Sequence, residues 1–286
     1  MTRRRFPVGK TLLYGFMSLW ALTTIYPFIW VILNSFKPRG LIRSDTFSLP
    51  IGDKFTLENY VTAFKRVDIG TAYVNSIVIS GAVTVVVMVL AGLAAYAMVR
   101  YSFRLRGFLH SMIIASMMFP VFSTIIPVFR MESSWGIVNT GSIWLTRLSV
   151  VLPQIAGNLS FAIIVLMGFI RSLPVDLEEA AYLEGYNVYQ IFFRIIMPLA
   201  KPSVVVTALM VLIYVWNEYI YATTFMTGEQ NYTLAAGLYA LQATETSGSW
   251  PVFAAASIIV SLPVLIIFFL SQKHMTSGLT AGGVKG

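Results

Sequence analysis

The sequence contains no cysteine and only two histidines, and charged residues make up 11% of its 286 positions. Without cysteine, the chain can form no disulfide bond, thiolate nucleophile or cysteine metal site. His110 and His274 lie far apart and have no companion ligands nearby in the sequence, so we expect no bound metal or cofactor. The phosphate loop G-x-x-x-x-G-K-[ST] and the metalloprotease motif H-E-x-x-H are both missing. We therefore expect no ATP hydrolysis and no other catalysis by this chain.

Apolar residues take the place of the missing charges. Hydrophobic residues account for 57% of the sequence, far above the usual share in a soluble domain, which indicates an integral membrane protein. The formal net charge is +8, which in a soluble protein would suggest a nucleic-acid partner. In a membrane protein, an excess of Lys and Arg on the cytoplasmic side accounts for the same charge. We expect a lipid bilayer as a partner, and no nucleic acid.

Six apolar runs reach or approach the ~20 residues that cross a bilayer. They are 11–33, 72–99, 108–129, 148–170, 203–225 and 252–270. The first run follows four basic residues, as a signal peptide does, but it is about twice as long as a signal core of roughly 7–15 residues. We expect it to remain as a span. The predicted fold is an all-α membrane protein, with residues 1–286 forming a single transmembrane domain of six helices and both termini on one side.

The distribution of basic residues indicates which side that is. Twelve of the 20 Lys and Arg residues lie in the N-terminus, the 100–107 loop, the 171–202 loop and the tail, and eight lie on the opposite side. The side with the excess is expected to be cytoplasmic. The outer segment 36–70 mixes both signs of charge with Pro38 and Pro50, and is expected to be a solvated excursion.

Proline and one carboxylate mark two spans as unusual. Pro120 and Pro127 should kink the third span, either to line a cavity or gate or merely to suit packing. Glu218 is the only formal charge inside the six runs, so it is a candidate for lining a pathway or gate. The alternative is that Glu218, with the aromatic residues near it, meets the outer headgroups. The same two alternatives, lining a pathway or gate and meeting the headgroups, apply to its neighbours Asn217 and Tyr219.

The segment 174–202 is polar and lies between two spans. Pro174 should stop the preceding helix, and Asp176 with Glu179 predicts a capping box that opens a short helix. Gly185 can end that helix in the left-handed conformation. Asn187 with Gln190 predicts a second capping box, and the helix it opens should end or bend at Pro198. The sequence therefore predicts two short helices that meet at a glycine.

This segment resembles the EAA loop of ABC importer permeases. The similarity is carried by Glu179, Ala180, Ala181, Gly185, Ile195, Pro198 and Pro202, with Glu184 keeping the charge where the family often has Asp. The resemblance implies the type I importer permease fold, with a cytoplasmic coupling helix seated in a cleft of the ATPase. The resemblance also implies which residues form the contact with the ATPase: Glu179, Ala180, Ala181, Glu184, Gly185 and Pro198.

Other parts of the chain resemble the carbohydrate class, in particular the maltose-type permeases. The run Trp216-Asn217-Glu218-Tyr219 is similar to sugar-importer permeases, which suggests Asn217, Glu218 and Tyr219 as pathway or gate residues. Pro120 joins them as a candidate because of the kink expected in the third span. The outer loop 227–250 corresponds to one that reaches into the binding protein in that class. The tail, including Gly283, Lys285 and Gly286, resembles one that enters the ATPase dimer interface.

The resemblance implies a sugar or oligosaccharide importer in a bacterial or archaeal cell membrane, driven by ATP through alternating access. The expected partners are a second permease of different sequence, two ATPase subunits that use ATP and Mg²⁺, and a periplasmic or extracellular solute-binding protein. The alternative is an ion-coupled secondary transporter. Such a protein usually has carboxylates or broken helices near the midplane and two repeated halves. The sequence shows one peripheral Glu and no evident repeat.

Overall fold

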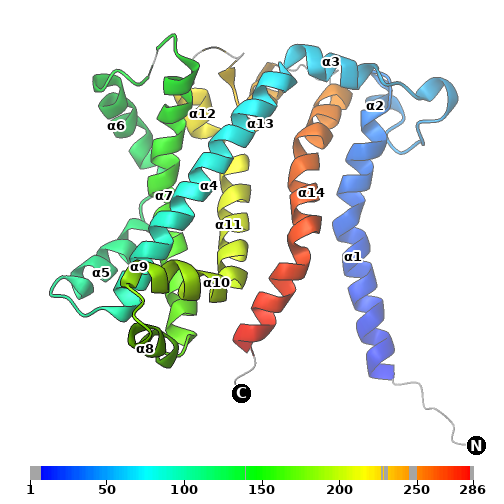
Figure 1. Cartoon of the computed structure of the whole chain (residues 1–286). Coiled ribbons are helices and arrows are strands. Elements are labelled where there is room, and N and C mark those ends of the chain that lie inside the picture. The colour runs from blue at the N-terminus through cyan, green and yellow to red at the C-terminus, as the bar shows by residue number, and fades with distance from the viewer. Residues whose placement is uncertain (1–7, 139, 227, 229–230, 245–249, 284–286) are drawn as a thin grey trace, which may run out of the picture. The chain divides into compact units, whose positions relative to one another are not determined.

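The computed structural model describes residues 8–138, 140–226, 228, 231–244 and 250–283, and among these residues it contains helices and connections but no strand. The all-α prediction is therefore confirmed. The described residues divide into two compact units, which are treated separately below. Unit 1 comprises residues 1–67 and 240–262, and unit 2 comprises residues 68–239 and 263–286. Figure 1 shows the helices in chain order.

Unit 1 begins with α1 (Val8–Ser35), whose apolar side chains are largely exposed, as expected of a helix in contact with lipid or with another subunit. The segment predicted to lie outside, 36–70, forms α2 (Leu41–Ser44), the 3-10 helix η1 (Gly52–Lys54) and α3 (Glu58–Arg66). This segment is more ordered than a solvated excursion. The Phe36 ring packs on Phe55 and Tyr60, and the fully buried Lys37 ammonium donates to the carbonyls of Asp45 and Thr46.

Asn59 ties α3 to the end of α1. Its buried amide donates to the carbonyl oxygens of Ser35 and Lys37, at 2.8 and 2.7 Å. Replacing Asn59 by Leu keeps the volume but leaves two carbonyls without this donor in a buried place, which costs about 1–3 kcal/mol. We expect a lower thermal unfolding midpoint for Asn59→Leu in detergent. Thr62→Ala, which removes one exposed bond from Arg39, is the control and should leave the midpoint nearly unchanged.

Unit 2 is built on α4 (Ile69–Arg100), α7 (Ile143–Ser172) and α11 (Lys201–Trp216). α4 lies along α7 and also contacts α11 (Figure 1). Small residues permit this closeness, because Ala91 and Ala95 of α4 and Ala162 of α7 are fully buried. Figure 1 shows α8 (Asp176–Leu183) and α9 (Val188–Ile191) at one end of α4, and α6 (Val121–Ser134) and α12 (Ile220–Phe225) toward the other.

Four helices are long and apolar enough to span a bilayer: α1, α4, α7 and α14 (Trp250–Gly283). α14 continues well beyond the predicted 252–270. Two further pairs of helices pass the same test only if each bent pair counts as one span. The number of spans in the described residues is thus four, or up to six.

The third predicted span, 108–129, is not one kinked helix. It consists of α5 (Arg106–Ser116) and α6, which are bent by 104° at the break between them. Pro120 is the residue before α6 and has extended backbone. Because proline has no N–H group to donate and disfavours helical geometry in the residue before it, the helix is interrupted here. Pro127 lies inside α6 without a break. The kink expected at Pro120 is therefore a break between two helices, while the kink expected at Pro127 stays a prediction.

The fifth predicted span, 203–225, is also interrupted. α11 ends at Trp216, residues 217–219 form a break, and the six-residue α12 follows. The Glu218 carboxylate accepts the backbone N–H of Tyr221 at 2.7 Å and so caps α12. The residue singled out for its charge therefore lies at a break in the helix, where a polar side chain can satisfy a free backbone group.

Candidate functional site

The start of the predicted coupling segment differs from the capping box expected at Asp176. The residue before α8 is Val175, whose carbonyl accepts from Glu178 and Glu179, and no side chain caps the helix. Asp176 is the first residue inside α8 and not its N-cap, so the capping-box prediction there is wrong. The helix starts early because Val175 already has helical backbone angles. Three carboxylates in the first turn still complement the helix dipole.

The turn between the two short helices follows the prediction closely. Gly185 has φ +86°, and its N–H donates to the carbonyl of Tyr182, while the N–H of Tyr186 donates to Ala181. These two bonds form a Schellman motif, which satisfies the last carbonyls of α8. Asn187 and Gln190 then form the reciprocal capping box that opens α9. The two predicted helices and the left-handed glycine are confirmed.

The second helix neither ends nor bends at Pro198. After α9 the chain forms a π-helical turn, η2 (Phe192–Ile196), and then α10 (Met197–Leu199), which contains Pro198. The N–H of Met197 donates five residues back to Phe192, so the wider turn accommodates a proline that cannot donate. The chain bends by 78° only between Leu199 and Lys201, just before Pro202.

The predicted coupling residues divide between two faces of the segment. Glu179, Ala180, Glu184, Gly185 and Pro198 are exposed, whereas Ala181 is buried within its own chain. Leu183, at the end of α8, is 91% exposed. The structure thus presents a protruding turn with a carboxylate on each side of an exposed leucine, a surface that suits a partner protein.

Sequence reasoning missed the residue that holds this segment to the rest of unit 2. Glu178 is buried, accepts from the Tyr96 hydroxyl at 2.8 Å and pairs with Arg100 at 2.5 Å. Arg100 also donates to the carbonyl of Leu173 at 2.9 Å. Glu178 and Ala181 share the buried face of α8, but the sequence does not distinguish Glu178 from the neighbouring Glu179 as the buried carboxylate. Nearby, a hydrogen bond with Tyr101 raises the pKa of Tyr182 to about 12.

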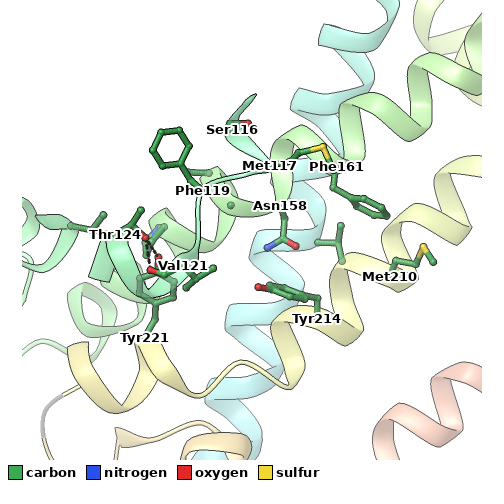
Figure 2. Close-up of a pocket in the computed structure, with 15 residues that line it drawn as sticks. Ser116, Met117, Phe119, Val121, Thr124, Asn158, Phe161, Met210, Tyr214 and Tyr221 are labelled. Carbon is green, nitrogen blue, oxygen red and sulfur yellow. Dashed lines mark hydrogen bonds between the residues drawn. The ribbon is translucent and has the colours of Figure 1, made fainter. Parts of the chain in front are cut away.

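The second candidate site is a cavity in unit 2 of about 950 Å³, and Pro120, Asn217, Glu218 and Tyr219 all line it. The four predicted pathway residues are therefore brought together by two helix breaks far apart in the sequence. A second cavity of about 630 Å³ shares part of its wall, including Asn158, Tyr214 and Tyr221. Figure 2 shows Asn158 of α7 and Tyr214 of α11 turned toward this space, with Tyr221 hydrogen bonded to Thr124 at 3.1 Å.

Polar atoms on the wall of the larger cavity are left without regular hydrogen bonds. Among the described residues, Glu218 Oε2 and Gln154 Nε2 are buried and have no partner of good geometry, although the Gln154 side chain lies close to the Glu218 carboxylate. Gln154 was not predicted from the sequence, because a single amide in an apolar run carries no pattern. Tyr219 also stacks on Tyr239, with ring centroids 4.7 Å apart. The cavity therefore combines aromatic faces with unsatisfied polar groups.

The base of the expected outer loop is fixed to α4, at a residue that also binds α7. The fully buried Asn75 donates to the carbonyls of Asn231 and Tyr232 at 2.6 and 3.2 Å, and accepts from Arg147 at 2.9 Å. Ser76 accepts the N–H of Leu234. Much of the loop expected at 227–250 lies outside the described residues, as do Lys285 and Gly286 of the tail. Gly283 is the last residue of α14.

Comparison with known proteins identifies the family. Residues 88–280 match the family described as "Binding-protein-dependent transport system inner membrane component". The chain is 34% identical over 270 residues to the trehalose/maltose transport system permease protein MalG of Thermococcus litoralis, which covers 94% of each protein. It is 32% identical over 276 residues to the inner membrane ABC transporter permease protein YcjP of Escherichia coli K12, with 96% of this chain and 95% of the relative aligned.

A solved structure supports the fold. A chain of a bacterial ABC transporter involved in the import of the acidic polysaccharide alginate superposes with a TM-score of 0.76 at 22% identity, covering 96% of this chain and 98% of that one. The family match includes the segment 174–202 and both bent helix pairs, so the resemblance stated from the sequence is confirmed. The chain therefore belongs to the family of inner membrane components of binding-protein-dependent transport systems, and is a multi-pass permease of that family.

Proposed function

We propose that this permease imports a sugar or oligosaccharide in a complex with a second permease, two ATPase subunits and a solute-binding protein. The observation that carries the proposal is the protruding turn α8–Gly185–α9, which lies between two apolar helices and leaves Glu179, Leu183 and Glu184 exposed. A permease without a phosphate loop needs such a surface to receive the motion of an ATPase. The trehalose/maltose relative supports a carbohydrate substrate.

In the proposed arrangement, the chain crosses the membrane six times, with both bent pairs counted as spans and both termini in the cytoplasm. The segment 174–202 then faces the ATPase, and Glu179, Ala180, Glu184 and Gly185 line the contact. The exposed Pro198 is available to the same contact, whereas the buried Ala181 packs within its own chain rather than touching the partner. The tail residues Gly283, Lys285 and Gly286 are proposed to reach the ATPase dimer. ATP and Mg²⁺ act on the partner subunits only.

The mechanism follows from these surfaces. ATP binding closes the ATPase dimer, the clefts that hold the two coupling segments draw together, and the attached helices tilt so that the pathway opens toward the binding protein. Hydrolysis reverses the motion. The break at residues 117–120 and the break at 217–219 allow the helices around the cavity to change their angle without losing regular hydrogen bonds within each piece.

The cavity of unit 2 is the proposed part of the sugar pathway on this chain. Sugar rings stack on aromatic faces, and sugar hydroxyls donate to and accept from amides and carboxylates. Tyr214, Tyr219, Asn217 and Glu218 provide both kinds of contact on one wall. Pro120 contributes through the break that it imposes on the helix.

The test of the proposal is purification of the tagged chain from its native membranes in mild detergent, followed by reconstitution of the purified complex in proteoliposomes. A P-loop ATPase and a second permease should copurify. In proteoliposomes whose ATPase subunits face the lumen, labelled sugars should enter only when ATP is present in the lumen and the binding protein is present outside. Uptake that follows an ion gradient without ATP would instead favour the secondary transporter.

The base of the outer loop offers a separate prediction. Asn75→Ala removes two hydrogen bonds that hold residues 231 and 232 against α4, and a third that joins Asn75 to Arg147 of α7. Each of these bonds is worth about 1 kcal/mol. We therefore expect the concentration of binding protein that gives half-maximal stimulation of ATP hydrolysis to rise about tenfold or more. Ser80→Ala is the matched control, because Ser80 is also buried in α4 but bonds only to its own helix. Equal stimulation curves for the two variants would contradict the prediction.

A further inference from the structure

The coupling segment is attached to α4 as well as to the helices that precede and follow it in the chain. Tyr96 and Arg100 lie one turn apart at the end of α4, and both bind the buried carboxylate of Glu178 on α8. The two carboxylate oxygens each have one of these donors. Arg100 also holds the carbonyl of Leu173, where the chain leaves α7. One end of α4 is therefore bonded to the beginning of the coupling segment.

The same residues of α4 contact the far limb of the segment. The ring of Tyr96 packs on Phe192 of η2, with centroids 5.4 Å apart. One turn earlier, a Cβ atom at Gly92 would meet Phe192 and Met197 at 3.4 Å, so the glycine allows η2 and α10 to approach closely. Tyr96 thus touches both α8, through its hydroxyl, and η2, through its ring.

The polar part of this contact is well protected from water. The side chains of Arg100 and Glu178 are 11% and 6% exposed. A buried ion pair whose remaining atoms are satisfied by neighbours holds one geometry, and removal of either partner leaves an uncompensated charge. Exposed ion pairs such as Lys54 with Asp45 lack that property. The contact is therefore suited to keep α8 and the end of α4 in one relative position when α8 moves.

We propose that Tyr96 and Arg100 are positioning residues that make the coupling helix α8 and the end of α4 move as one body. The proposal rests on the proposed function, in which α8 receives the motion of the ATPase. α4 packs along α7 and against α11, so motion delivered to Glu178 reaches the helices around the cavity through α4. The covalent path through α10 and α11 is bent by 78° and is a second route.

The first test compares variants in the complete transporter, with uptake per ATP hydrolysed as the readout. Glu178→Gln keeps an acceptor for Tyr96 but removes the charge paired with Arg100, and we expect this ratio to fall about tenfold or more. Tyr96→Phe should lower it by less. Arg104→Gln is the control, because it removes an exposed positive charge four residues beyond Arg100 and should leave the ratio unchanged. Equal ratios for Glu178→Gln and Arg104→Gln would overturn the inference.

A second test does not depend on the folding of Glu178→Gln. The chain has no cysteine, so spin labels can be attached at Asp176→Cys on α8 and Arg104→Cys beyond α4, both exposed positions. The distance between the labels should agree within about 2 Å in nucleotide-free and ATP-trapped complexes that retain uptake. A larger change would overturn the inference while leaving the importer intact. Lack of ATP-driven uptake in the unmodified complex would instead overturn the proposed function.

Discussion

Replacing Gly185 by proline is expected to abolish ATP-driven uptake while the chain still inserts into the membrane. Proline fixes φ near −65°, whereas Gly185 has φ +86°. Proline also removes the N–H that donates to Tyr182 and closes the turn after α8. Both effects change the direction in which α9 leaves α8, so the protruding turn would lose its shape. Uptake and membrane content, measured on the same preparation, give the result.

Two milder substitutions at Gly185 separate backbone conformation from bulk. A Cβ atom there meets nothing within 4 Å, so Gly185→Ala adds only the cost of a left-handed residue, about 1–2 kcal/mol. Asn adopts that conformation more readily, so Gly185→Asn should retain more uptake than Gly185→Ala. Normal uptake by Gly185→Pro would contradict the role given to this turn.

Reversing the charge of Glu179 is expected to reduce uptake about tenfold or more by weakening the contact with the ATPase. Glu179 is exposed in the first turn of α8, where the helix dipole favours a carboxylate by only about 0.3–1 kcal/mol at a surface. Glu179→Lys should therefore fold and insert normally. The expected loss is in the amount of ATPase subunit that copurifies, together with the loss of uptake.

Asp176→Lys provides the matched control for this variant. Asp176 is also exposed in the first turn of α8 and loses the same dipole interaction, but it lies farther from the protruding end at Leu183 and Gly185. It should retain most of the ATPase contact. If both lysine variants lost the ATPase equally, the effect would belong to the helix and not to a specific contact at Glu179.

Local chemistry accounts for the features that the sequence predicted well. Gly185 and the Asn187–Gln190 capping box are set by backbone conformation and by bonds that reach no farther than three residues. Apolar run length likewise predicted α1, α4 and α7, since crossing a bilayer requires it. The error at Asp176 arose because two adjacent positions could begin the helix, and the backbone of Val175 decided between them.

Features that depend on distant contacts could not be read in this way. Glu178 contacts Arg100 and Tyr96, which lie 78 and 82 positions away in the sequence. Because Glu178 and Glu179 are adjacent carboxylates, the sequence does not indicate which of the two is buried. The π-helical turn at 192–196 was also not predicted, because a proline by itself indicates only that the helix ends or bends at Pro198. The residues that line the cavity were predicted only in part. Glu218 was predicted because it is the only charge in the apolar runs, whereas the uncharged Gln154 was not predicted.

The most direct test of the account is photo-crosslinking from the exposed end of α8 in native membranes. Benzoylphenylalanine at Leu183, which is 91% exposed, should form an adduct with a P-loop ATPase subunit, identified by mass spectrometry. The same group at Phe47, which is 80% exposed in the segment 36–70 proposed to face outward, is the control and should give no ATPase adduct. Labelling of the ATPase from Leu183 alone is the predicted result. Absence of that adduct from a complex that takes up sugar would contradict the assignment of 174–202 as the coupling segment.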